Sequence, residues 1–134
     1  MPDPIITNNK NFGVVVWEPV FENEKVTFAG AATLLAGTIM ARDSVSGFLV
    51  PFVVGGVTNE NGIPKAILKD ALTATVAGDL PVRAIIAGRV RENQLIIDAD
   101  QDNSNVNKGV LDDLRDYTMI GLESTPLNIL DNQP

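Results

Sequence analysis

The chain has 134 residues, with 10 basic and 17 acidic side chains, a net charge of −7, and neither cysteine nor histidine. The negative charge argues against nucleic acid or an anionic membrane surface as the main partner, because both attract basic surfaces. The two missing residue types exclude disulfides, cysteine-ligated metals and every catalytic relay built on histidine, which leaves carboxylate-based and lysine-based chemistry among the enzyme classes.

The length and a hydrophobic content of 45% predict one globular domain. No uncharged apolar run approaches the length of about 18 residues that suggests a membrane span. The N-terminal residues offer neither the basic start nor the apolar stretch of a secretory signal. We therefore expect a protein that is cytoplasmic when it is made.

Residues 1–24 are predicted to form an extended N-terminal arm. Early prolines disfavour a helix, and valine-rich stretches beside proline are typically extended. The apolar residues of this arm are candidates for contact with another protein: Ile5, Ile6, Phe12, Val14, Val16 and Trp17. The alternative is an edge strand that packs on its own domain, with Trp17 in the core or in a subunit interface.

Residues 25–134 are predicted to form one β-rich domain with one or two short helices, an α+β fold. Strands are expected at 26–28, at 33–41, where Gly37 marks a bulge or a close backbone approach, and at 48–54, where Pro51 suggests an edge or a bulge. Residues 63–72 fit a short helix or a strand, and periodicity leaves both open.

The second half of this domain is predicted to contain a hairpin, a helix and a last strand. The hairpin would pair 82–90 with 94–98, with Gly88 as a bulge and residues 91–93 at its tip. A polar linker, 98–108, precedes a helix at 109–116 and a strand at 117–122. The tail 124–134 has no assignment.

Few residues offer chemistry, so we expect no catalytic residue, metal or cofactor. Asp98, Asp100 and Asp102 resemble the start of a calcium loop, but Asn103 and Gly109 stand where that loop needs glycine and glutamate. A solvated acidic linker with at most weak calcium binding is the simpler interpretation. The serines of the turn at 42–47 have no histidine to activate them, and Lys65 and Lys69 fit a solvated surface.

Four segments carry a resemblance to a known family: VTFAGAATLLAGTIMAR at 26–42, IPKAILKDAL at 63–72, DLPVRAIIAGRVRENQL at 79–95 and LDDLRDYTMIGLESTPLNILDNQ at 111–133. The shared features are spaced glycines in apolar segments, a strand that ends in Gly-x-Val, and a short helix before an apolar Met-Ile-Gly-Leu element. Over about residues 26–122 the chain resembles the head decoration proteins of tailed bacteriophages, of the phage lambda protein D type.

The resemblance implies a small, mainly β, cysteine-poor structural protein that is not an enzyme. Members form homotrimers on the outside of the expanded head, at its three-fold and quasi-three-fold positions, and stabilise it against internal DNA pressure. The implied partners are the major capsid protein and the chain itself, with an N-terminal arm that pairs with capsid strands. The implied location is the outer surface of the virion, and the host cytoplasm during assembly.

Two alternatives belong to other classes. A small β-barrel binding or adaptor module for a peptide or a small molecule would be a monomer in solution. A carboxylate-based enzyme would need two acidic side chains about 5–9 Å apart in a pocket.

Overall fold

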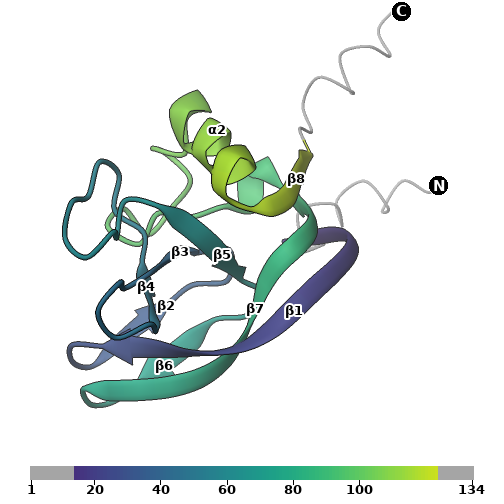
Figure 1. The fold of residues 1–134 in the computed structure, drawn as a ribbon. Coiled ribbons are helices and arrows are strands. Elements are labelled where there is room, and N and C mark those ends of the chain that lie inside the picture. The colour runs from purple at the N-terminus through teal and green to yellow at the C-terminus, as the bar shows by residue number, and fades with distance from the viewer. Residues whose placement is uncertain (1–13, 124–134) are drawn as a thin grey trace, which may run out of the picture.

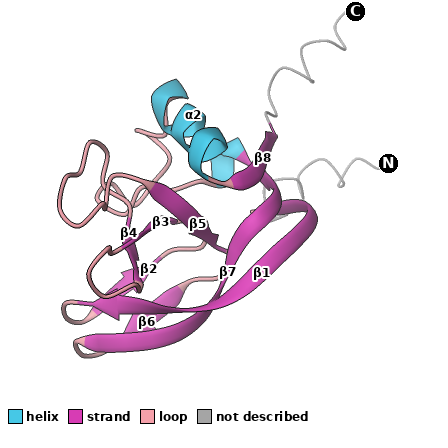
Figure 2. Ribbon diagram, viewed as in Figure 1, coloured by secondary structure: helices cyan, strands magenta, loops and turns pink. Residues whose placement is uncertain are grey.

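The computed structural model describes residues 14–123, and residues 1–13 and 124–134 lie outside the described part of the chain. Strands dominate this part, with one α-helix and one short 3-10 helix (Figures 1 and 2). In chain order the elements are β1 (Val15–Phe28), β2 (Ala32–Leu34), β3 (Ile39–Arg42), β4 (Leu49–Pro51), β5 (Pro64–Leu68), β6 (Leu72–Ala74), β7 (Gly78–Arg91), η2 (Glu92–Gln94), α2 (Lys108–Tyr117) and β8 (Met119–Glu123).

The largest sheet closes on itself into a small barrel. Its strand order is β1-β4-β3-β5-β7-β8, and an additional pairing joins β1 to β7. β1 and β7 form a long antiparallel ribbon that crosses the whole molecule (Figure 1). β8 runs parallel to β7 at the end of this order, and β2 pairs with β6 in a separate two-stranded sheet. The mainly β fold with one short α-helix therefore confirms the predicted fold class.

Two hydrophobic cores lie on opposite faces of the central strands. Successive side chains of a strand point to opposite faces, so Ile39 and Ala41 of β3 belong to one core and Met40 to the other. In β5, Ile67 and Leu68 divide in the same way. Strands that are buried on both faces read as continuous apolar runs rather than as an alternating pattern, which explains the apolar residues 39–41 of β3.

The helix α2 covers the first of these cores. Its three buried residues, Val110, Leu111 and Leu114, all belong to that core. At its N-terminus the Asn107 side chain accepts a hydrogen bond from the backbone N–H of Val110 at 3.1 Å, an ordinary N-cap. The helix predicted at 109–116 is therefore confirmed to within one residue at each end. Within residues 14–123 no helix combines the length and apolarity that crossing a membrane requires.

The predicted boundary at residue 24 has no counterpart in the structure. β1 begins at Val15, and its backbone pairs with β7 from there to Phe28. Most of 15–24 is therefore sheet, as in the alternative of a strand packed on its own domain. Pro19 is tolerated because the register pairs Trp17 with Arg89 and then Val20 with Ala87, so the ladder skips the proline.

The predicted hairpin between 82–90 and 94–98 is wrong. Both sides of β7 are taken by β1, β5 and β8, so no edge is left for a return strand. Residues 92–94 form the short helix η2, after which Leu95 and Ile97 enter the first core. Gly88, the expected bulge, does have a φ of 111°, and it faces the irregular stretch of β1 around Pro19.

Four other predicted elements are shorter or divided in the structure. The strand expected at 33–41 is split into β2 and β3 by Gly37, whose φ is 94°. The segment 63–72 forms the strand β5 and the first residue of β6, so the helical alternative is wrong. The strand expected at 48–54 is limited to β4, and the last predicted strand is β8.

Candidate interaction surfaces

Both ends of the described chain lie at the same end of the barrel. Val90 of β7 is the register partner of Val15 on one side and of Leu122 on the other. The backbone N–H of Arg91 donates to the carbonyl of Val14 at 2.9 Å, which fixes the first described residue beside β7. The first and last described residues, Val14 and Glu123, therefore both lie beside Arg91 of β7. Figure 1 shows this end of the barrel, where β8 ends beside β7.

The candidate contact residues of the N-terminal segment fall into three groups. Ile5, Ile6 and Phe12 lie outside the described residues. Val14 is 3% exposed and belongs to the first core, so in this conformation it is not available to a partner. Val16 and Trp17 belong to β1, with the backbone of Trp17 opposite Arg89.

Two chain reversals lie side by side at the other end of the β1–β7 ribbon. The turn 29–31 connects β1 to β2, and the turn 75–77 connects β6 to β7. Their flanking residues are paired, since Phe28 is opposite Gly78 and Ala32 is opposite Ala74. Val76 is 71% exposed in the second turn.

Two longer loops, 43–48 and 52–63, precede and follow β4, and a hydrogen bond joins them. The backbone N–H of Ser44 donates to the carbonyl of Asn59 at 3.0 Å. Within the second loop the N–H of Val53 donates to the carbonyl of Asn61 at 2.9 Å. The two loops expose Val45 at 80% and Val57 at 92%, as well as Val53 and Val54.

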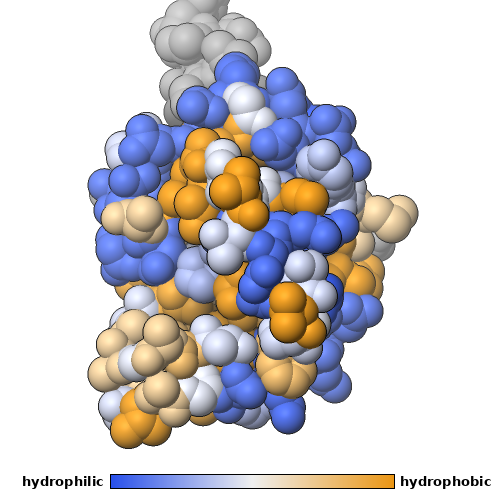
Figure 3. Space-filling model, turned by 60° about the vertical axis from the view of Figure 1, so that its left-hand side comes forward, coloured by the Kyte–Doolittle hydropathy of each residue, from blue (hydrophilic) through white to orange (hydrophobic). Residues whose placement is uncertain are grey.

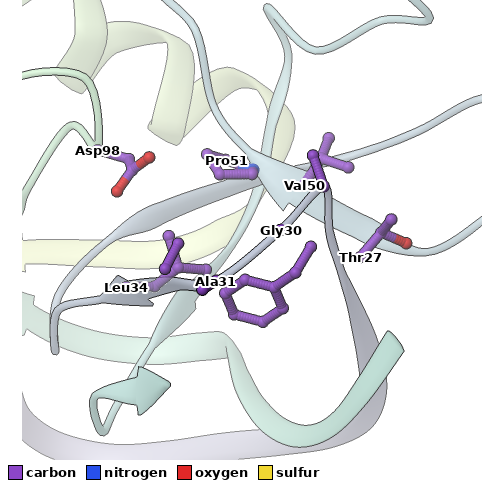
Figure 4. A pocket seen from close by; sticks show the side chains of 10 residues that line it. Thr27, Gly30, Ala31, Leu34, Val50, Pro51 and Asp98 are labelled. Carbon is purple, nitrogen blue, oxygen red and sulfur yellow. The ribbon is translucent and has the colours of Figure 1, made fainter. Parts of the chain in front are cut away.

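A hollow of about 480 Å³ lies between the turn 29–31 and β4. Its lining consists mostly of small or apolar residues: Thr27, Phe28, Ala29, Gly30, Ala31, Ala32, Leu34, Val50, Pro51 and Asp98. Asp98 and Thr27 lie at opposite ends of the hollow, with Pro51 and Val50 between them (Figure 4). Burial raises the pKa of Asp98, and a hydrogen bond from Gln101 partly offsets this effect.

We call the surface made by the turns 29–31 and 75–77, the hollow, and the loop residues 44–47 and 53–58 the uncharged face. No charged residue occurs in the sequence segments 26–41, 44–59 and 71–78, so of the residues named for this face only Asp98, at the edge of the hollow, carries a charge. Figure 3 turns this side of the molecule forward and shows hydrophobic clusters across it. Clusters of exposed apolar side chains are a common feature of protein–protein contact sites.

The acidic loop after η2 does not form a converging site. Asp98 accepts a hydrogen bond from Gln101, Asp100 from Asn105, and Asp102 from Ser104. Each carboxylate thus has a partner of its own. Among residues 14–123 no group of three acidic side chains could hold a metal ion.

The other candidate residues for chemistry have structural surroundings. Ser44 and Ser46 lie in an exposed turn, where Asp43 accepts hydrogen bonds from the N–H groups of Val45 and Ser46. These bonds lower the pKa of Asp43. Lys65 is exposed on β5, and its ammonium group lies 5.8 Å from the centre of the Tyr117 ring, within reach of a cation–π interaction.

Two features of these surfaces were missing from the sequence interpretation. The ion pair between Glu24 and Arg42 joins β1 to β3 and has no sequence signature, because the two residues come together only in the barrel. The uncharged face did have a sequence signature, because residues 44–59 form a run of 16 residues without charge in an acidic chain.

A comparison with protein families finds a match that includes the whole of β1 and the uncharged face. The family model described as bacteriophage lambda head decoration protein D matches residues 7–117. The match extends through most of the described chain, from β1 to the end of α2, and also includes part of the segment before residue 14. No curated protein matches the chain.

Proposed function

Because this chain belongs to the family of bacteriophage lambda head decoration protein D, and so has a capsid decoration role, we propose that it acts as a homotrimer on the outer surface of the expanded head. Its positions would be the three-fold and quasi-three-fold points of the shell, and its partner there the major capsid protein. The family match over residues 7–117 is the observation that carries this proposal.

The role requires contact area and several binding points rather than catalysis, so no reaction is proposed. A ligand that binds only the assembled shell shifts the equilibrium towards assembly and opposes the pressure of packaged DNA. A net charge of −7 suits an outer surface that must stay soluble at high local density. The protein would be made in the host cytoplasm and would reside on the virion.

The N-terminal segment is the part of the chain that we assign to the capsid. Ile5, Ile6 and Phe12 would supply apolar burial, and extended backbone can add to the edge of a capsid sheet. Val16 and Trp17 would extend this contact from the start of β1, whereas Val14 is already used in the core. The placement of Val15 and Leu122 on either side of Val90 supports an orientation in which this end of the barrel faces the shell.

Three arms on one trimer make a strong bond from weak contacts. Ordering ten residues costs on the order of 10–20 kcal/mol of backbone entropy, so one arm alone binds weakly. Each additional arm engaged raises the apparent affinity by a factor on the order of 10²–10⁴ when the geometry allows simultaneous binding.

The proposal is tested by titrating undecorated, expanded shells with the purified protein. We expect uptake of trimers at saturable sites and a higher melting temperature of the shell. Saturating protein that leaves the shell's melting unchanged would contradict the stabilising role. A protein that fails to bind shells would contradict the capsid partner itself.

A further inference from the structure

We propose that the uncharged face is the contact between copies of this chain in the trimer, in which the hollow of one copy receives the exposed valines of the loops 44–47 and 53–58 of the next copy. This inference rests on the trimer proposed above and adds the surface that would form it. Val14, the first described residue, lies beside Arg91 at the other end of the β1–β7 ribbon, so this inference leaves that end of the barrel for the capsid contact proposed above.

The apolar character of the face is the first reason. Val57 and Val45 are 92% and 80% exposed, and Val76 protrudes from the neighbouring turn. Single exposed valines are ordinary, but here several lie on loops that are joined by hydrogen bonds and by paired flanking strands. Burying these valines against another molecule would remove several neighbouring apolar clusters from water (Figure 3).

The distribution of charge identifies another copy as the occupant. Each copy carries a net charge of −7, so contact through most of its surface would bring like charges together. The segments 26–41, 44–59 and 71–78 are free of charge, and two copies can therefore approach through them without this repulsion. The acidic residues that border the face, such as Asp43, Glu60 and Asp79, would remain at the rim.

The shape of the face suits a ring rather than a pair. In a ring of three, each copy must offer two different surfaces that fit one another, whereas a two-fold dimer uses the same patch twice. The uncharged face contains both a concave part, the hollow beside Pro51, and a protruding part, the loop that carries Val57. Pairing the concave part of one copy with the protruding part of the next satisfies this requirement.

The first experiment places a charge in the proposed contact. Val57→Asp and Val45→Asp should each raise the concentration at which the trimer dissociates by about tenfold or more, because a carboxylate would be buried without a partner. Val20→Asp is the matched control, since Val20 is half exposed on β1, outside the uncharged face. Mass is measured by light scattering or sedimentation, and thermal melting checks that each variant is folded.

The second experiment separates the two halves of the contact. Ala31→Arg would obstruct the hollow, because Ala31 lines it and is exposed. At a concentration between the dissociation points of the wild type and the variants, Val57→Asp and Ala31→Arg should each be folded monomers while the wild type is a trimer. An equimolar mixture of the two should give heterodimers, because one intact hollow can still meet one intact valine loop.

The outcomes distinguish this inference from the capsid role. Trimeric Val57→Asp and Ala31→Arg variants would overturn it, and if such trimers also failed to bind shells, the face would belong to the capsid contact. A wild-type protein that decorates shells but stays monomeric at every concentration would overturn the inference together with the trimer. If the wild type is a trimer that does not bind shells and the two substitutions dissociate it, the inference is supported and the capsid role is contradicted.

Discussion

Arg42 and Glu24 form a two-point ion pair that fixes β1 to β3. Arg42 Nη1 lies 2.9 Å from Glu24 Oε1, and Arg42 Nη2 lies 2.9 Å from Glu24 Oε2. Arg42 Nη1 also donates to the carbonyl of Gly47 at 2.8 Å, which connects the pair to the loop that carries Val45. β1 and β4 share a single register pair, Val26 with Leu49. The ion pair therefore adds a second connection between β1 and this side of the barrel.

Glu24→Gln should destabilise the protein by about 1 kcal/mol, because it removes the charge of a partly buried, two-point pair. The Glu24 side chain is only 11% exposed, so solvent weakens the pair less than at an open surface. The matched control is Asp112→Asn, which removes an exposed pair with Arg115 and should change stability by less than about 0.5 kcal/mol. Urea unfolding at neutral pH measures both, and equal effects would contradict the assignment.

The same pair predicts how stability depends on pH. Hydrogen bonds from Arg42 lower the pKa of Glu24 below its ordinary value of 4.5, so its contribution is present above that pH and is lost as the pH falls through the folded-state pKa. The difference in unfolding free energy between wild type and Glu24→Gln should therefore shrink on acidification from pH 6 towards pH 3. A difference that stays constant over this range would show that the charge of Glu24 is not the cause.

The effect of Glu22 on stability should depend on pH in the opposite sense to that of Glu24. A hydrogen bond with the neighbouring Glu24 carboxylate raises the pKa of Glu22, with burial and repulsion acting in the same sense. A raised pKa contributes stability at low pH, which is lost as the pH rises through it. Glu22→Gln should therefore increase stability slightly at neutral pH in the same urea series, and a loss of stability there would contradict this sign.

Gly37→Ala should be among the most destabilising small substitutions, costing about 2–4 kcal/mol. Gly37 has a φ of 94°, and a Cβ there would lie 2.0 Å from the carbonyl oxygen of Gln94. Its own N–H donates to the carbonyl of Leu68 at 2.7 Å, so the backbone cannot easily move away.

Gly121→Ala, outside the uncharged face, is the control for this substitution. A Cβ added at residue 121 would make only ordinary contacts at 3.6 Å, and the backbone there has no positive φ, so the change should be close to neutral. Thermal melting measures both variants. A Gly37→Ala protein with the melting temperature of the wild type would mean that the backbone around Gly37 is loosely packed against Gln94.

The sequence predicted local features better than pairings. The helix at 109–116 was correct because caps and a narrow apolar face are local, and Gly37 was correctly identified as a close approach. The partners of β7 could not be predicted, because a strand of 14 residues can pair on either side along its length. The predicted arm ran to residue 24 because a sequence with proline and polar residues is typical of a free segment. The register shifts that accommodate Pro19 within β1 are not visible in the sequence.

Truncation tests where the arm ends. Removing residues 1–13 keeps Val14 in the core and leaves all of β1, so the variant should fold, melt close to wild type and remain a trimer. Removing residues 1–24 also deletes most of β1, including the strand backbone that pairs with 82–90 of β7 and the Glu24 partner of Arg42. This longer deletion should fail to give a cooperatively melting protein.

The shorter deletion then reports on function alone. Because the barrel would be unchanged, loss of shell binding by the variant without residues 1–13 would place the capsid contact in that segment. Retained shell binding would instead place that contact on the described surface, and loss of the trimer would move the segment into the interface between copies. Only with a boundary at Val14 can these results be separated, since a deletion to residue 24 would remove shell binding by unfolding the barrel, whatever the arm contacts.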